Sequence, residues 1–308
     1  MKVVIVNKKN LINKLFYIGV LIISTIIIYF IYNSSASKEA ISPVNLIQEI
    51  KTDLNGDGKK EILQQINSQN KIDFSITSSN DNVYLSTLID DKTLFTNNIH
   101  WQPKAFINDI SRDTIPELII QGSKDNKPIS YVFHWDKKNY SLVYSSNNNI
   151  LGILDSKNSK TPQCFSISSS EGTASLNSFM LINDTILDTS KENSKIPSFD
   201  SVTKFIDIVQ LPYIFDELPD IFTTSIDKGN LSLLWSLDKD NYNYTFQNGF
   251  FYDYKWNEDY APSNLRWRLS FEKSSYRGNQ SDKSEFTILI DLEKINDSYK
   301  INSIQKIK

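Results

Sequence analysis

The longest uninterrupted apolar run in the chain covers residues 15–32 and contains no charged residue. As a helix it would span roughly 27 Å, close to the thickness of the hydrocarbon core of a bilayer. Lys2, Lys8, Lys9 and Lys14 precede this run without an intervening acid, and no comparable cluster follows it. The pattern predicts a transmembrane helix behind a cytoplasmic tail, residues 1–14, with the rest of the chain outside the cytoplasm.

A cleaved signal peptide is the alternative interpretation of the same segment. Ser34, Ser35 and Ala36 form a small-residue site at which a signal peptidase could cut, which would make the protein secreted. The apolar run is longer than the core of ordinary signal peptides, which has about 7–15 residues. We therefore expect a single-pass protein of the cell membrane with a linker over residues 33–44, and both interpretations export residues 38–308.

Beyond the linker, apolar and polar residues alternate with a period of two over many short segments, which predicts strands. Residues 131–135 and 140–144, for example, flank a turn-forming tetrapeptide and predict a hairpin. The polar stretch 188–200 lacks periodicity and predicts a second linker. These patterns favour an all-β repeat region over residues 45–187, followed by an α+β domain over residues 201–308.

The C-terminal part combines a helical pattern with strands. Apolar residues recur at helical spacing from Val202 to Val209, after a capping residue at Asp200 or Ser201. Asn248-Gly249 then predicts a hairpin with a type I′ turn that places Phe246 opposite Phe251.

Further strands follow that hairpin. Alternation predicts two of them, around Trp267 and Ile288, and a last strand begins near Tyr299. Helices followed by a curved antiparallel sheet resemble cystatin-like or NTF2-like α+β domains.

Two segments of the β-rich region are similar to each other. One runs from Asp53 to Leu63 and the other from Asp109 to Ile120, and both lead directly into an apolar strand. A fainter third copy begins at Asp155, but its further polar positions are lost. Internal repeats of this length imply stacked supersecondary units.

The first of these segments has the oxygen spacing of a calcium loop. Calcium takes six to eight oxygen ligands at about 2.3–2.6 Å. Side chains at positions one, three, five and nine, with a backbone carbonyl at seven, can surround one ion, and Gly58 permits the left-handed backbone of the turn. The ligands expected here are Asp53, Asn55, Asp57, the carbonyl of Lys59, and Glu61. The alternative is a surface turn of acidic residues without an ion.

These loops resemble the FG-GAP or VCBS-like repeats of integrin-type β-propellers, in which D-x-D/N-x-D-G-x-x-D/E precedes a strand. The resemblance covers about residues 45–190. It implies that this region forms partial propeller-like blades and that the first loop holds calcium. The second loop departs from the pattern at Ser111 and Thr114, so it is a repeat for which a metal and a plain turn both stay open. Its expected ligands are Asp109, Ser111, Asp113 and Glu117.

Composition adds two limits to this picture. Cys164 is the single cysteine and cannot form an internal disulfide, and its strand-like context predicts a small core residue. The basic start and more acidic body of the chain argue against nucleic acid as a partner.

Motifs for catalysis are missing. The chain has two histidines, His100 and His134, and contains no H-E-x-x-H, G-x-S-x-G or P-loop motif. The adjacent acids Glu258 and Asp259 fit a solvated loop better than a glycosidase pair. The aromatic residues around Trp256 and Trp267 suit a core, or alternatively a platform for stacking a ligand.

Two classes of function remain. We expect a non-enzymatic, membrane-anchored binding or scaffolding module that calcium stabilises, with a cell-surface glycan or protein as its partner. The alternative is a cell-envelope hydrolase that acts on glycans through a site built from acidic loops.

Overall fold

The computed structural model describes residues 23, 25, 49–79, 81–155, 161–213, 217–277 and 282–307. The chain divides into two compact units, Met1–Ala40 and Ile41–Lys308. In the first unit only Ile23 and Thr25 are described, and both are helical. Most of the predicted membrane segment, residues 15–32, therefore lies outside the described residues. In the part of the chain that the structure describes, no helix combines the length and the hydropathy needed to cross a membrane.

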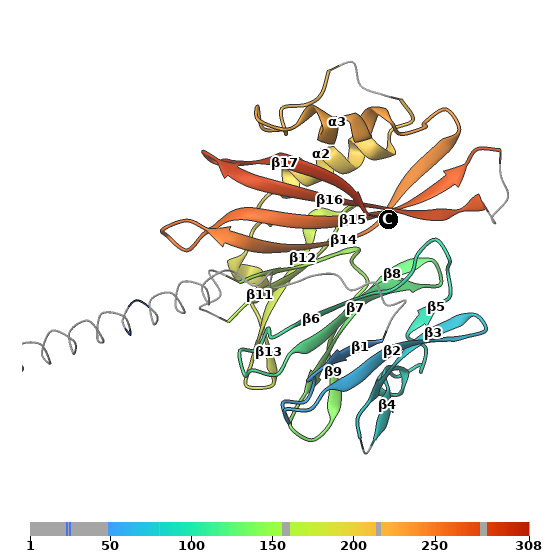
Figure 1. Ribbon diagram of the computed structural model, residues 1–308, viewed down its shortest axis with the longest axis vertical. Coiled ribbons are helices and arrows are strands. Elements are labelled where there is room, and N and C mark those ends of the chain that lie inside the picture. Colours follow the sequence, from blue (N-terminus) through green and yellow to red (C-terminus); the bar gives the residue numbers. More distant parts are fainter. Residues whose placement is uncertain are drawn as a thin grey trace, which may run out of the picture. The chain divides into compact units, whose positions relative to one another are not determined.

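The second unit consists mainly of antiparallel sheets, as the alternation of apolar and polar residues predicts (Figure 1). The first sheet has the order β1-β2-β3-β4, and β5 pairs with β3. Its strands are β1 (Ile50–Thr52), β2 (Glu61–Ser68), β3 (Lys71–Thr77), β4 (Asn82–Tyr84) and β5 (Phe95–Thr96), with the 3-10 helix η1 (Leu85–Leu88) after β4.

The second sheet is a four-stranded meander in the order β6-β7-β8-β9. Its strands are β6 (Lys104–Asn108), β7 (Glu117–Lys124), β8 (Lys127–Trp135) and β9 (Tyr140–Ser146). The last two confirm the hairpin predicted over residues 131–144.

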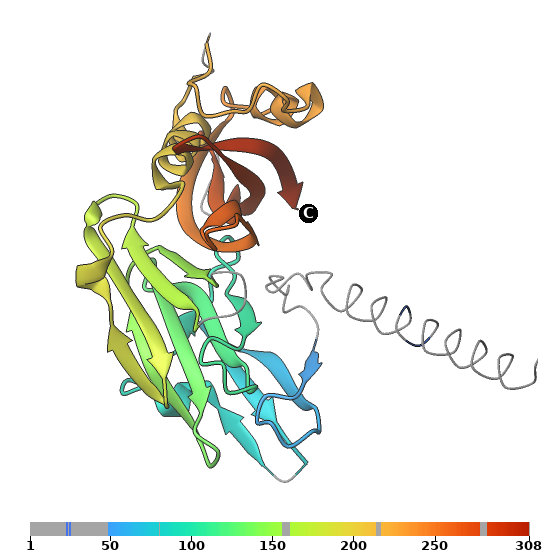
Figure 2. The same ribbon diagram turned by 90° about the vertical axis from the view of Figure 1, so that its left-hand side faces the viewer.

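The third sheet has eight strands, in the order β13-β12-β11-β10-β14-β15-β16-β17. The strands are β10 (Ile150–Leu154), β11 (Gln163–Ser168), β12 (Gly172–Ile182), β13 (Thr185–Asp188), β14 (Tyr242–Trp256), β15 (Pro262–Ser275), β16 (Ser284–Ile295) and β17 (Ser298–Ile307). Neighbours are antiparallel except β10 and β14, which run parallel. The sheet thus joins strands from both sides of residues 188–200, and β14–β17 curl strongly in Figure 2.

Three of the loops are equivalent by strand pairing. The last pair before each loop is Thr52 with Glu61, Asn108 with Glu117, and Leu154 with Gln163. In each pair, the residue on the earlier strand directly precedes the aspartate that begins a related segment: Asp53, Asp109 or Asp155. All three related segments therefore connect the first strand of a meander to its second.

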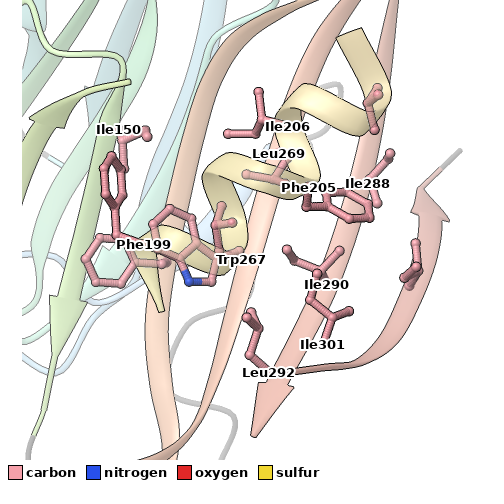
Figure 3. Close-up of a cluster of buried hydrophobic side chains, with 14 of the residues drawn as sticks. Ile150, Phe199, Phe205, Ile206, Trp267, Leu269, Ile288, Ile290, Leu292 and Ile301 are labelled. Carbon is pink, nitrogen blue, oxygen red and sulfur yellow. The ribbon is translucent and has the colours of Figure 1, made fainter. Parts of the chain in front are cut away.

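The helices α2 (Phe199–Gln210) and α3 (Lys228–Trp235) pack on the C-terminal strands, and η2 (Ser190–Glu192) lies before α2. Figure 3 shows Phe199, Phe205 and Ile206 of α2 facing the sheet. The sheet presents alternate buried residues to the helix, among them Trp267, Leu269, Ile288 and Ile290. The apolar face of α2 and the alternation in β15 and β16 are therefore confirmed.

Two local predictions in this region are wrong. The residue that caps α2 is Ser198, not Asp200 or Ser201, and its side chain makes no capping hydrogen bond. The hairpin at Asn248-Gly249 does not form, because β14 continues through it. Gly249 pairs with Ile150 of β10 on one side and with Leu269 of β15 on the other. Pairing on both edges outweighs the local preference of Asn-Gly for a turn.

Candidate metal centre

The first loop, between β1 and β2, is organised around the carboxylate of Asp53. Its Oδ1 accepts hydrogen bonds from the backbone N–H groups of Gly56 at 2.7 Å and Asn55 at 3.3 Å. Its Oδ2 accepts from the N–H of Gly58 at 2.9 Å. Gly56 and Gly58 have φ angles of 78° and 81°, a left-handed backbone conformation in which a residue with a side chain would be strained. These two conformations turn the amides toward Asp53.

The other predicted ligands continue the same loop. The Asn55 side-chain oxygen accepts from the N–H of Asp57 at 2.9 Å, and Asp57 accepts from the N–H of Lys59 at 2.7 Å. Glu61, which is buried, accepts from the N–H of Leu54 at 2.7 Å and from the Asn55 amide at 3.1 Å. All five residues therefore belong to one turn whose backbone is held by their own side chains.

The three carboxylates of this loop have no basic partner in the described part of the chain. One further polar group responds to their charge. The hydroxyl of Tyr140 is buried without a hydrogen-bond partner. Its pKa is raised, first by burial and then by the negative charges of Glu61, Asp53 and Asp57. The Tyr140 hydroxyl is therefore a buried polar group within the field of the three acids of this loop.

The second loop, between β6 and β7, repeats this arrangement. Asp109 accepts from the N–H groups of Arg112 at 2.7 Å and Thr114 at 3.1 Å, as Asp53 does from Gly56 and Gly58. Asp113 accepts from the N–H of Ile115 at 2.9 Å. Buried Glu117 accepts from the N–H of Ile110 at 2.7 Å. The hydrogen-bond frame is the same although both glycines are gone.

Ser111 closes the polar set of this loop, and its hydroxyl donates to Asp113 at 3.0 Å. Arg112 and Thr114 keep the left-handed backbone, with φ angles of 65° and 77°. The four predicted residues of the second loop, Asp109, Ser111, Asp113 and Glu117, are thus brought together.

Basic side chains are in contact with the second loop. The Arg112 guanidinium forms an ion pair with Asp155, the first residue of the third copy, and also donates to the carbonyl of Asp109 at 3.3 Å. Asp155 in turn donates its N–H to Asp253 of β14 at 2.7 Å. Burial lowers the pKa of Arg112, while Asp109 and Asp253 oppose that shift. The arginine therefore ties the second loop to the third.

His134 of β8 is the second basic side chain in contact with this loop, and the sequence pattern did not identify it. Its Nδ1 lies 2.8 Å from Glu117 and its Nε2 lies 3.0 Å from Asp184. The hydrogen bond with Glu117 raises the pKa of His134 most, burial lowers it, and Asp184 raises it further. Asp184 sits in the turn between β12 and β13, 50 residues away, so no local pattern links the two.

Asp113, His134 and Asp184 also form a possible metal cluster. One ligand atom of each lies within 4.8 Å of the others. Imidazole and carboxylate ligands suit a transition metal, and a carboxylate on the other ring nitrogen is the usual support of such a histidine. Among the described residues, the carboxylates of Asp53, Asp57 and Glu61 are not gathered this closely.

The remaining candidates from the sequence lie elsewhere. Cys164 is buried in β11, and burial raises the pKa of its thiol, as expected for a core residue. Glu258 and Asp259 are exposed in a turn. Tyr252 and Trp267 are buried, so they form no stacking platform.

Comparison with models of known protein families finds no match for this chain, and a search of curated proteins finds none either.

Proposed function

We propose that this chain is a non-enzymatic, membrane-anchored binding or scaffolding module whose first repeat loop holds calcium. One observation carries the proposal. The two repeat loops share one hydrogen-bond frame, but among the described residues only the second has basic side chains in contact with it, Arg112 at the Asp109 carbonyl and His134 at Glu117. The first loop collects three carboxylates without such a partner, and a divalent cation from solution would supply the missing charge.

The donor set fits a hard cation. Asp53, Asn55, Asp57, the Lys59 carbonyl and Glu61 offer oxygen atoms alone, which calcium prefers and soft metals do not. The unpartnered Tyr140 hydroxyl beside them would gain a partner from a water molecule of a bound ion. With an ion in place, these residues would hold the start of β2 against the end of β1, where Thr52 and Glu61 pair.

The proposed architecture is that of FG-GAP or VCBS-like repeats. Three meanders in sequence, each with a polar loop between its first and second strands, support this assignment. The uncharged run over residues 15–32 supports a membrane anchor with the repeats outside the cytoplasm. The sequence contains none of the catalytic motifs considered above, which favours binding over catalysis.

Calcium titration of the full-length chain tests the proposal. We expect a dissociation constant of about 10⁻⁴–10⁻³ M, the range of extracellular modules. At a free calcium concentration ten times that value, binding would stabilise the fold by about 1.4 kcal/mol and raise the unfolding temperature by a few degrees. Calorimetry and thermal unfolding, each with calcium and with a chelator, measure both quantities.

A matched pair of variants locates the ion. Asp57→Ala should remove most of the calcium response, because Asp57 has no basic partner and is an expected ligand. Asp113→Ala changes the equivalent residue of the compensated loop and should leave more of the response intact. Absence of binding at millimolar calcium, or equal loss in both variants, would contradict the proposal.

A further inference from the structure

Three side chains with metal-binding atoms come together between the second and the third meander. They are Asp113 of the β6–β7 loop, His134 of β8, and Asp184 of the turn between β12 and β13. One ligand atom of each lies within 4.8 Å of the others. The ligands of a tetrahedral zinc ion lie about 3.3–3.5 Å apart, given bonds of about 2.0–2.1 Å. A shift of about 1–1.5 Å at most would therefore let the three atoms share an ion.

The ring of His134 is already oriented for coordination. Its Nδ1 lies 2.8 Å from the buried carboxylate of Glu117, and its Nε2 lies 3.0 Å from Asp184. A histidine that binds a metal usually donates its other ring N–H to a carboxylate, which fixes the tautomer and the direction of the ring. With the N–H of Nδ1 donated to Glu117, the lone pair of Nε2 faces Asp184. Glu117 thus supports the histidine and is not itself a ligand of this site.

The backbone places Asp184 at the open side of the cluster. Ile182 pairs with Thr185, so Asn183 and Asp184 form a two-residue hairpin turn. Their φ angles of 49° and 60° are those of a type I′ turn, which favours Asn and Asp. The side chain of Asp184 is 53% exposed, whereas that of His134 is 1% exposed. Solvent therefore reaches the Nε2 side of the ring past the Asp184 carboxylate.

The charges around the imidazole favour a cation. Asp113 forms no ion pair with any described residue, and it accepts hydrogen bonds from neutral groups of its own loop. Carboxylates of Asp113, Glu117 and Asp184 thus surround one histidine. A proton on His134 offsets one of these three negative charges, whereas a divalent cation on the neutral ring offsets two. Carboxylates that converge in this way are stabilised by an opposite charge between them.

We propose that Asp113, His134 and Asp184 bind a divalent transition metal ion, for which zinc is the best match. One imidazole nitrogen and two carboxylate oxygens suit zinc, with water at the open position. Calcium prefers oxygen ligands alone, and manganese and iron(II) bind nitrogen-containing sites more weakly than zinc does. The ion would join the second meander to the third, across 50 residues of chain. This inference goes beyond calcium binding by the first loop, and neither depends on the other.

Zinc binding to the metal-free, full-length chain tests the inference. Calorimetry is performed in excess calcium, which competes for sites built from oxygen alone. We expect one zinc ion per chain and a higher unfolding temperature with zinc than without it. Cobalt(II) is the second probe, because its visible absorption reports a nitrogen ligand and a low coordination number, which surface carboxylates do not provide.

Substitutions of two ligands locate the ion. Asp184→Asn lies in an exposed turn whose conformation Asn also adopts, so the fold should be kept while zinc affinity falls about tenfold or more. His134→Gln should abolish the cobalt absorption. His100→Gln is the matched control, since the ring of His100 contacts Glu272 of β15 instead, and it should change neither the zinc affinity nor the cobalt absorption.

Four outcomes would overturn the inference. The first is that zinc does not bind to the unmodified chain at about 100 μM. The second is equal zinc affinity in the unmodified chain and in Asp184→Asn. The third is displacement of zinc by an equal concentration of calcium, and the fourth is loss of zinc binding in Asp57→Ala, which would place the ion in the first loop. Calcium binding by the first loop is measured without zinc, so either proposal can fail alone.

Discussion

The first and second repeat loops hold acidic residues at equivalent positions but differ in the basic side chains that contact them. Asp53 and Asp109 organise the same backbone amides, and Glu61 and Glu117 hold equivalent positions at the start of β2 and β7. Yet among the described residues only the second loop has basic partners: His134 contacts Glu117, and Arg112 links the loop to Asp155 of the third copy. The comparison teaches that a repeat can keep its hydrogen-bond frame while the basic side chains in contact with it change.

The buried glutamates should show the largest difference between the loops. Glu117→Gln removes the charge opposite His134 in a fully buried pair and should destabilise the fold by about 2–3 kcal/mol. Glu61→Gln also weakens two hydrogen bonds but relieves repulsion among three acids, so without calcium it should cost less than about 1 kcal/mol. Urea unfolding in a chelator measures both values. Equal destabilisation would mean that the charge balance of the two loops is the same.

Exchanging the residues at the left-handed turn position should give an intermediate effect. Gly58→Thr should cost about 1–2 kcal/mol, because φ is 81° and no atom within 4 Å would clash or support the new side chain. Thr114→Gly relieves similar strain but gives the unfolded chain more freedom, so its net effect should stay within about 0.5 kcal/mol. Urea unfolding of both variants measures these free energies. A large loss of stability in Thr114→Gly would show that the Thr114 side chain has another role.

The smallest expected effect is the pH dependence of the second loop. The pKa of His134 is raised in the folded chain, so its contribution to stability is complete below the unfolded pKa of about 6.5. That contribution is lost as the pH rises through the higher folded pKa. His134→Gln should therefore flatten the stability profile above pH 6.5. The pKa of His100, the other histidine, is lowered in the folded chain, so its effect on stability changes below pH 6.5, where stability falls as the pH falls. An unchanged slope above 6.5 in His134→Gln would remove His134 from the comparison.

Patterns in the sequence predicted the parts of the molecule that depend on neighbours along the chain. The apolar face of α2, the alternation around Trp267 and Ile288, and the turn that contains Gly58 follow from periods and backbone preferences. Asn248-Gly249 misled for the same reason, since its local turn preference is overridden by β10, a distant strand.

Contacts between distant segments explain what the sequence could not give. The contact of His134 with Asp184 and the ion pair of Arg112 with Asp155 join separate meanders, and no local period encodes them.

The parallel pairing of β10 with β14 has a consequence for the order of folding. Gly152 leaves a space that the ring of Phe251 fills, since an added Cβ would lie 2.2 Å from that ring. Near this contact the backbone N–H of Asp155 donates a hydrogen bond to the carboxylate of Asp253, 98 residues later in the chain. During synthesis, the strands of the first two sheets can therefore close while β10 still lacks its partner. Until β14 is made, one edge of β10 exposes its backbone groups, and closing so long a loop is slow. Folding of this protein should therefore be limited by the arrival of its last third, and incomplete chains should be prone to aggregate through β10.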